Sequence, residues 1–181
     1  MGSKCLNQMN DQFALAIWDV KQRTLFLARD RMGIRPLYYT QVNDQFVFAS
    51  EIKAILQHPE VTREIDPYTI QQIFTFWTPL PGRSVFKNIF ELKPGHHMMI
   101  RDSQIKEQAY WDVPFCTPES QTDSPIEMLC DELQEILLDA VRIRFRADVP
   151  VGSYLSGGLD SSLITALISH HFNHDIQTFG H

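Results

Sequence analysis

The first part of the chain alternates apolar runs with short polar segments, as strands joined by turns do. Residues 12–20 (QFALAIWDV) and 24–30 (TLFLARD) are rich in apolar and aromatic side chains and flank the charged segment KQR, which predicts a hairpin. A second hairpin is predicted for PLYYT and QFVFAS, because the segment between them contains Asn43 and Asp44, which favour turns. Two further short strands are expected around the turn RDSQ at 101–104.

Helical spacing replaces this alternation in two places before residue 80. The segment EIKAILQH (51–58) carries apolar residues on one helical face and is followed by Pro59, which predicts a short helix. In DPYTIQQIFTFW (66–77), Asp66 is a suitable N-cap and Pro67 suits the first helical turn. The segment between the hairpins and residue 100 therefore adds helices to a β-rich domain.

The composition changes at residues 114–125 (PFCTPESQTDSP), a polar, proline-bearing stretch that is typical of an interdomain linker. We therefore expect one domain over residues 1–113, a linker at 114–124 and a second domain over 125–181. The second domain should open with a long amphipathic helix, whose apolar face is formed by Ile126, Leu129, Leu133, Leu137 and Val141.

The last part of the chain reads as a strand, a glycine-rich loop, a helix and a second strand. The first strand ends at Leu155, the helix lies within SSLITALISHHF, and the second strand is DIQTF (175–179). This order predicts a βαβ unit, which begins a parallel sheet.

The loop itself, within YLSGGLDSSL (154–163), has the residues of an anion site. A helix N-terminus offers free backbone N–H groups and the positive end of the helix dipole, and both favour phosphate. Adjacent glycines allow close approach of the backbone, and Ser156, Ser161 and Ser162 add hydroxyl donors. Asp160 would repel phosphate by itself, so we expect it to hold a hard cation such as Mg²⁺ that also binds the phosphate oxygens.

Other phosphate and catalytic loops fit this segment poorly. A Walker A loop needs a lysine after its second glycine, and none follows Gly158. The dinucleotide pattern G-x-G-x-x-G is absent, and Tyr154 stands where the first glycine of the hydrolase motif G-x-S-x-G would be. A plain Gly-Gly turn with helix-capping serines is the alternative without a ligand.

Several longer segments resemble known families. SGGLDSS at 156–162, preceded by VPVGSYL, resembles the pyrophosphate loop of N-type ATP pyrophosphatases. FALAIWD, LFLARDRMGIRPLYY and FASEIKAIL resemble the second half of a class II glutamine amidotransferase domain. In this order, joined by FTFWTPLPGRSVFKNIFELKPGHHMMI, they resemble glutamine-hydrolysing asparagine synthetases. The resemblance implies an α+β part followed by an α/β part: a partial αββα N-terminal-nucleophile sandwich, then the first βαβ unit of a parallel-sheet ATP pyrophosphatase domain.

The resemblance also implies a function, that of a carbon–nitrogen ligase that uses ATP and Mg²⁺. Aspartate is activated as β-aspartyl-AMP with release of pyrophosphate, and ammonia from glutamine then displaces AMP. By this resemblance Leu155 lies against the nucleotide and Asp160 binds the metal. The full set of ATP- and pyrophosphate-binding residues is Leu155, Ser156, Gly157, Gly158, Leu159, Asp160, Ser161 and Ser162.

The chain departs from the family at both ends. After the linker it contains roughly one βαβ unit, where the family's synthetase domain continues through several more strands. The family's glutaminase nucleophile is a cysteine exposed at the N-terminus after removal of Met, whereas here Gly2 follows Met1 and the nearest cysteine is Cys5. We therefore assign no catalytic residue, and expect an internal piece of a larger enzyme that catalyses neither half-reaction by itself. Such a piece should expose sheet edges, and we expect self-association or a homodimer.

Two rival functions stay open. One is a related enzyme that amidates or cyclises another carboxylate, such as a β-lactam synthetase or an amidotransferase of surface-polysaccharide clusters. The other is a non-catalytic module that binds nucleotide.

Composition narrows the partners and the compartment. The net charge of −6 and the absence of a basic run argue against nucleic acid as a partner. No apolar stretch reaches the ~20 residues that span a bilayer, so no membrane partner is expected. Three widely spaced cysteines form neither a C-x-x-C pair nor a disulfide framework, which favours a cytoplasmic location. The charged cluster Arg29, Asp30, Arg31 and Arg35 is predicted to form a buried ion network.

Overall fold

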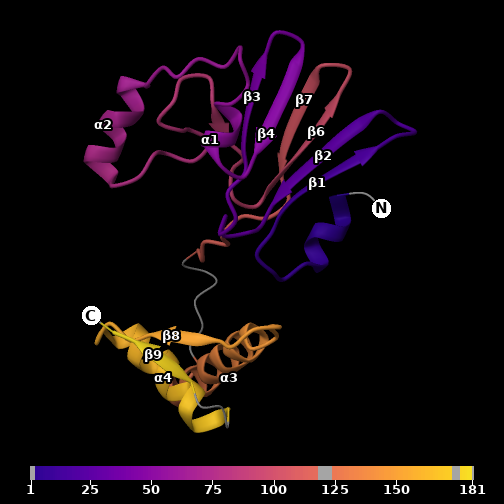
Figure 1. Cartoon of the computed structure of the whole chain (residues 1–181). Coiled ribbons are helices and arrows are strands. Elements are labelled where there is room, and N and C mark those ends of the chain that lie inside the picture. Colours follow the sequence, from indigo (N-terminus) through magenta and orange to yellow (C-terminus); the bar gives the residue numbers. More distant parts are fainter. Residues whose placement is uncertain (1–2, 118–123, 173–175, 181) are drawn as a thin grey trace. The chain divides into compact units, whose positions relative to one another are not determined.

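A computed structural model describes residues 3–117, 124–172 and 176–180 of the chain (Figure 1). The chain divides into two compact units, Met1–Phe115 and Cys116–His181, which are called unit 1 and unit 2 below. Part of the predicted linker, residues 118–123, lies outside the described residues.

Unit 1 is built mainly from antiparallel strands. Its first sheet has the order β1-β2-β6-β7 and its second the order β4-β3-β5. The elements in chain order are the 3₁₀ helix η1 (Ser3–Gln8), β1 (Ala14–Asp19), β2 (Thr24–Arg29), β3 (Tyr38–Val42), β4 (Gln45–Ala49), α1 (Ile52–Ile55), α2 (Pro67–Phe76), β5 (Phe90–Glu91), β6 (His96–Arg101) and β7 (Gln104–Ala109). All three predicted hairpins are confirmed as β1–β2, β3–β4 and β6–β7.

The core of unit 1 lies between its two sheets. The buried cluster contains Leu27 from β2, and Met98 and Ile100 from β6. Tyr39, Phe46 and Phe48 of the second sheet pack against this cluster. The two sheets therefore form the two β-layers of a sandwich, and the mixed α/β architecture with antiparallel sheets is confirmed.

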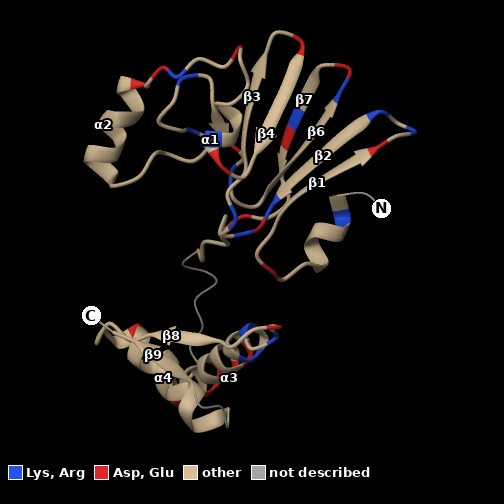
Figure 2. Ribbon diagram, viewed as in Figure 1, with Lys and Arg blue, Asp and Glu red and all other residues tan. Residues whose placement is uncertain are grey.

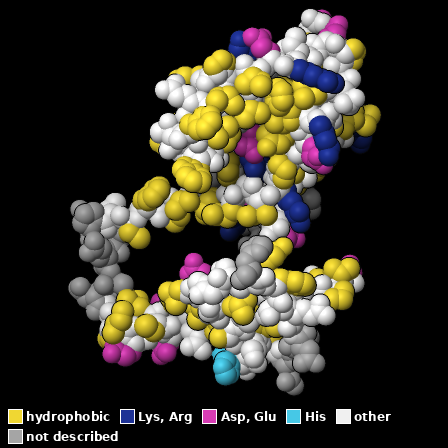
Figure 3. Space-filling model, turned by 60° about the vertical axis from the view of Figure 1, so that its left-hand side comes forward, with side chains coloured by type: hydrophobic (Ala, Val, Ile, Leu, Met, Phe, Trp, Pro, Cys, Tyr) yellow, Lys and Arg dark blue, Asp and Glu magenta, His cyan; other side chains and the backbone are white. Residues whose placement is uncertain are grey.

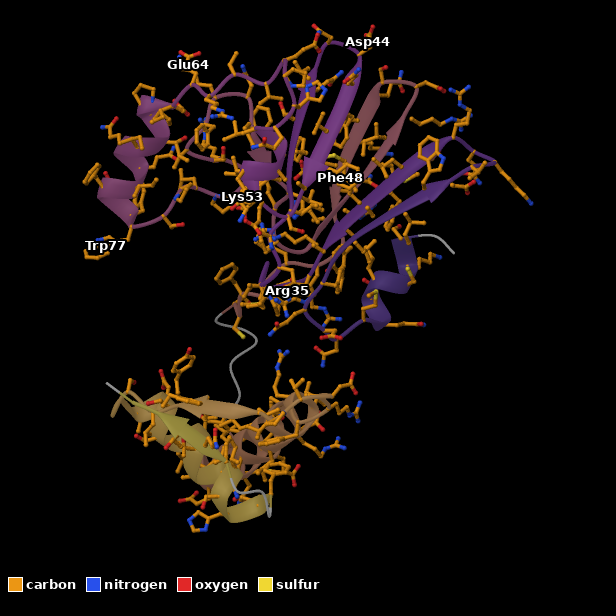
Figure 4. All side chains as sticks on the ribbon, viewed as in Figure 1. Arg35, Asp44, Phe48, Lys53, Glu64 and Trp77 are labelled. Carbon is orange, nitrogen blue, oxygen red and sulfur yellow. The ribbon has the colours of Figure 1, made fainter. Side chains whose placement is uncertain are left out.

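The helices of unit 1 match their predictions unevenly. Asp66 is the N-cap of α2 and Pro67 its first residue, as expected. The helix predicted over 51–58 is shorter, because only Ile52–Ile55 is helical before the chain turns towards Pro59. Trp77 ends α2 in a left-handed conformation (φ 65°), and its side chain, 93% exposed, points away from the unit (Figure 4).

The predicted buried ion network exists in part. Arg29 is 5% exposed and pairs with Glu91 at 2.9 Å. Asp30 is 2% exposed, but its carboxylate accepts the backbone N–H groups of Ile34 and Arg35, both at 2.9 Å. The side chain of Arg35 is exposed, so the network consists of one buried ion pair and one buried carboxylate that shapes a loop.

Unit 2 contains the predicted strand–loop–helix–strand order. Its elements are α3 (Ile126–Arg144), β8 (Gly152–Tyr154), α4 (Leu159–His171) and β9 (Gln177–Phe179). Strands β8 and β9 pair in parallel, with Gly152 opposite Gln177 and Tyr154 opposite Phe179. The βαβ geometry is therefore present, built on a sheet of two strands.

The long helix α3 begins at Ile126, and its predicted apolar face is covered unevenly within the described residues, with Leu129 and Leu137 partly buried. Ile126 and Leu133 are 66% and 56% exposed, and Val141 is its buried residue. Pro125 occupies the N-cap position and makes no side-chain cap bond. Acidic and basic residues are interspersed along the described chain (Figure 2), and no described helix combines the length and apolarity needed to cross a membrane.

Candidate functional site

The candidate site is the loop that joins β8 to α4. The N–H of Leu155 donates to the carbonyl of Phe179 at 2.8 Å, so strand pairing continues to the residue where the loop begins. Gly157 has a φ of +80°, and a Cβ there would meet no atom within 4 Å. Glycine is required at this position by backbone conformation and not by lack of space, because L-residues rarely adopt a positive φ.

The hydroxyl of Ser161 organises the loop from inside. It donates to the carbonyl of Gly158 at 3.1 Å and accepts the N–H of Ser156 at 3.3 Å. The Oγ atoms of Ser156 and Ser161 are 3.1 Å apart. A hydroxyl has one proton, so when Ser161 donates to Gly158, Ser156 is the donor in this last contact. Ser161 therefore serves the loop's own shape in this conformation.

The first turn of α4 presents free donors at the loop. Gly158 is the N-cap and makes no side-chain cap bond, and the first bond of the helix runs from the N–H of Ser162 to Gly158 at 3.1 Å. Within the described part of the chain, no hydrogen bond engages the N–H groups of Leu159, Asp160 or Ser161. These groups and the helix dipole make the start of α4 suitable for an anion.

The loop is exposed to solvent, and side chains of α4 and β8 contact each other next to it. Gly157, Gly158 and Asp160 are exposed, and Leu159 is 84% exposed. Thr165, one turn further along α4, donates to the carbonyl of Ser161 at 2.8 Å and lies 3.3 Å from the hydroxyl of Ser153 in β8. The contact between Thr165 and Ser153 joins α4 to β8 next to the loop.

The residues present fit a magnesium ion that is shared with phosphate. Asp160 is the acidic residue of the first turn of α4. Among the described residues, no three His, Cys, Asp or Glu side chains gather to hold a metal by themselves. Mg²⁺ is commonly held by one or two carboxylates together with substrate phosphates. Asp160 would supply the carboxylate, and the free N–H groups beside it would bind the phosphate and not the metal.

One polar residue of unit 1 was not singled out from the sequence as a site residue. His97 on β6 is 4% exposed, and its Nδ1 has no hydrogen-bond partner among the described residues. It borders a pocket of about 290 Å³, also lined by Lys4, Asn7 and Gln108. His96 and His97 point to opposite faces of a strand, so one of the two imidazoles is expected to be buried. The sequence does not indicate which one. Cys5, the cysteine nearest the N-terminus, lies inside η1 and is partly buried.

Comparison with known proteins finds matches for both units. The family described as "Glutamine amidotransferase domain" matches residues 1–111, and the family described as "Asparagine synthase" matches residues 132–180. A relative from Bacillus subtilis, named asparagine synthetase [glutamine-hydrolyzing] 3, is 40% identical over 93% of this chain and 27% of its own length. A relative from Gibberella zeae, named amidase chry2, is 32% identical over 93% of this chain and 25% of its own length.

The chain thus spans about a quarter of the length of these two curated relatives. A solved structure of glutamine phosphoribosylpyrophosphate amidotransferase from B. subtilis, complexed with ADP and GMP, aligns with 97% of this chain and 33% of its own. The TM-score is 0.40 at 16% identity, which is too low to carry an inference.

Proposed function

Because this chain belongs to the glutamine amidotransferase domain family, which matches residues 1–111 of its 181, we propose that it is part of a glutamine-hydrolysing asparagine synthetase. The order of the two family matches supports this, since an amidotransferase match precedes an asparagine synthase match in one chain. The names of its relatives support it as well. Under this proposal unit 1 belongs to an N-terminal-nucleophile sandwich and unit 2 to an ATP pyrophosphatase domain.

The site proposed for unit 2 binds the pyrophosphate part of ATP. The observation that carries it is the exposed start of α4, where free N–H groups follow Gly157 at positive φ and Asp160 is the acidic residue of the first turn. The N–H groups of Leu159 to Ser161 would donate to phosphate oxygens, with Ser156 and Ser162 adding hydroxyls. Asp160 would hold Mg²⁺, which neutralises charge on the phosphates when it is bound.

In the proposed reaction, the side-chain carboxylate of aspartate would displace pyrophosphate from the α-phosphorus of ATP and form a mixed carboxylic–phosphoric anhydride, whose leaving group is AMP. Donors aimed at the departing pyrophosphate lower the barrier, because they stabilise charge that grows as the α–β bond breaks. Leu155 would lie against the nucleotide. Ammonia from glutamine would then displace AMP and form the amide.

A second candidate is a relative that acts on another carboxylate. The relative from Gibberella zeae carries a different name, amidase chry2, and its match covers the same share of this chain as that of the asparagine synthetase, so similarity alone does not single out aspartate as the acceptor. Under either candidate the residues of the loop between β8 and α4 would bind phosphate and metal, so they do not distinguish the acceptors. Turnover assays of a protein as long as these relatives, with aspartate and with other carboxylates as acceptors, would distinguish the two candidate functions.

Calorimetric titration of the chain with Mg²⁺-ATP and Mg²⁺-pyrophosphate tests the site directly. We expect saturable binding to both, and a loss of affinity for both in Asp160→Ala. Asp131→Ala removes an exposed acid from α3 of the same unit and should leave binding unchanged. Heat equal to that of buffer, or equal affinities of the two variants, would reject the site.

The same preparation tests whether the chain turns over substrate. We propose that it does not release ammonia from glutamine, since Cys5 lies within η1. We also propose that it does not release AMP from ATP and aspartate, since the asparagine synthase match covers only residues 132–180 and the chain spans about a quarter of the length of its relatives. Binding without turnover is the expected result. Ammonia release that Cys5→Ser abolishes would contradict this part of the proposal.

A further inference from the structure

Hydroxyl groups join the two elements on either side of the candidate loop. Both units show hydrophobic side chains at the surface (Figure 3), whereas the contacts around this loop are polar. Ser153 lies in β8, two residues before the loop begins at Leu155, and Thr165 lies in α4, four residues after Ser161. The Oγ atom of Ser153 and the Oγ1 atom of Thr165 are 3.3 Å apart, and both residues are partly buried. The contact therefore connects the strand that enters the loop with the helix that follows it.

The positions of the protons follow from the distances. The hydroxyl of Thr165 donates to the carbonyl of Ser161 at 2.8 Å, a bond to the residue four positions earlier that threonine often forms in helices. A hydroxyl has one proton, so Ser153 is the donor in the 3.3 Å contact and Thr165 is its acceptor. The carbonyl of Tyr154 lies 3.4 Å from the hydroxyl of Ser153, which is a longer contact. Thr165 thus bonds within α4 and to β8 at the same time.

The alternation of side chains along β8 places Ser153 against the helix. Successive side chains of a strand point to opposite faces, and Tyr154 is 83% exposed while Ser153 is partly buried. Ser153 therefore faces α4, where its hydroxyl meets Thr165. An alanine at position 153 would remove this donor and leave Thr165 bonded within its own helix only.

We propose that Thr165 is a positioning residue of the pyrophosphate site and acts through Ser161; this role rests on the function proposed above. The hydroxyl of Ser161 accepts the N–H of Ser156 at 3.3 Å and donates to the carbonyl of Gly158 at 3.1 Å, so Ser161 sets the shape of the loop. Thr165 holds the backbone of Ser161 at a fixed distance from β8, and thereby keeps the free N–H groups of the first turn in place. Donors that are already in place bind an anion more tightly, because binding then requires no ordering of the loop.

Calorimetric titration of the chain with Mg²⁺-pyrophosphate tests this role with Thr165→Val, which keeps the branched shape and removes the hydroxyl. We expect the dissociation constant to rise about three- to tenfold, the effect of one or two ordinary hydrogen bonds. Thr165→Ser keeps the hydroxyl and should bind as the wild type does. Ser169→Ala, which removes an exposed hydroxyl one turn further along α4, is the matched control and should also leave binding unchanged. Titration well below the thermal midpoint of each variant keeps a loss of stability from changing the measured affinity.

Ser153→Ala tests the contact with β8 by itself. It should raise the dissociation constant about twofold or more. The double variant with Thr165→Val should bind no more weakly than Thr165→Val alone, because both changes remove the same contact. Ser153→Ala also provides the test of the role if Thr165→Val does not fold, and an unchanged affinity would then overturn it.

The outcomes separate this role from the site itself. A wild type that does not bind Mg²⁺-pyrophosphate would reject the site, and the role of Thr165 with it. Binding by the wild type that Thr165→Val leaves unchanged, with or without a lower thermal midpoint, would overturn the role alone. An equal loss of affinity in Thr165→Ser and Thr165→Val would overturn it as well, since the hydroxyl would not be the cause. Losses that add in the double variant would overturn the link between Thr165 and β8.

Discussion

Arg29 and Glu91 form an ion pair inside unit 1, with Nη2 of Arg29 2.9 Å from Oε1 of Glu91. The guanidinium also donates to the carbonyls of Gly33 and Arg35, at 2.7 and 2.8 Å, and of Leu92 at 2.7 Å. One side chain on β2 thereby holds both the loop that follows its strand and the end of β5. Because Arg29 is buried and makes all four of these contacts, its removal leaves Glu91 and three carbonyl groups without this partner.

Replacing Arg29 should therefore destabilise unit 1 strongly. We expect Arg29→Met to lower the free energy of unfolding by about 3–5 kcal/mol, the usual effect of breaking a buried pair. Arg83→Ala is the control, because the exposed guanidinium of Arg83 lies 3.8 Å from Asp66, and such pairs contribute about 0–1 kcal/mol. Urea unfolding followed by tryptophan fluorescence measures both, since Trp18, Trp77 and Trp111 all lie in unit 1. Equal losses would contradict the expectation.

The N-cap of α2 should make the stability of unit 1 depend on pH in the acid range. Asp66 accepts the hydroxyl of Thr69 at 2.7 Å and the N–H of Tyr68 at 3.1 Å. The bond from Thr69 is the largest cause that lowers the pKa of Asp66 below 3.8; the Tyr68 N–H and Arg83 add to it, and burial opposes it. A carboxyl whose pKa is lower in the folded state stabilises the fold above the unfolded value, and loses this effect as pH falls through the folded value.

Asp66→Asn should accordingly lower the urea midpoint at neutral pH. The difference from the wild type should shrink as the pH falls below 3.8 and through the folded pKa. Asp44→Asn, in the turn between β3 and β4, is the matched control and should run parallel to the wild type. If the urea midpoints of Asp66→Asn and the wild type differed by the same amount at every pH, the stabilising effect of the N-cap would not depend on the charge of Asp66.

The sequence predicts those elements whose causes are local. The three hairpins follow from apolar runs broken by turn residues, and α2 follows from Asp66 and Pro67, because each of these signals acts within a few residues. The shorter α1 and the two-residue β5 have weak local signals. The partners of Arg29 lie up to 63 residues away along the chain, so no spacing rule reaches them.

In the loop between β8 and α4, too, some features are predictable from the sequence and others are not. Its place between a strand and a helix is predictable, since Gly157, Gly158 and the serines mark such a turn in the sequence. The inward role of Ser161 is not, because all three serines are equal hydrogen-bond donors until the backbone is folded. The exposure of Ile126 and Leu133 on α3 could not be predicted either, because a sequence pattern shows that a helix face is apolar but not which part of it is covered.

Acidification should destabilise unit 1 through His97 in a different pH range. Burial is the largest cause that lowers the pKa of His97 below 6.5, and His96 and Lys106 act in the same direction. The unfolded chain then binds a proton at a pH where the folded chain does not, so stability falls as the pH drops from about 6.5 through the folded value. His97→Gln should remove this loss, while His58→Gln, which is less buried, should retain it. Thermal midpoints measured across this range provide the test, and parallel curves for wild type and His97→Gln would count against it.

The turn before β6 should tolerate no side chain. Gly95 has a φ of +65°, and a Cβ there would lie 2.4 Å from the backbone oxygen of Trp111. Gly82 also has a positive φ, +87°, but its Cβ would meet the side chain of Lys93 at 3.2 Å. Both alanine variants carry backbone strain of about 1 kcal/mol, whereas only Gly95→Ala must also displace main chain, at a further cost of about 1–3 kcal/mol.

The displaced segment is bonded to Gly95 itself. The carbonyl of Gly95 accepts the N–H groups of Tyr110 and Trp111, at 2.9 and 3.2 Å. Moving Trp111 therefore weakens the end of the β6–β7 pairing. We therefore expect the urea midpoint of Gly95→Ala to fall clearly below that of Gly82→Ala, with tryptophan fluorescence as the probe. Equal midpoints would mean that the segment around Trp111 yields without loss, and that conformational strain alone determines the effect of a side chain at either glycine.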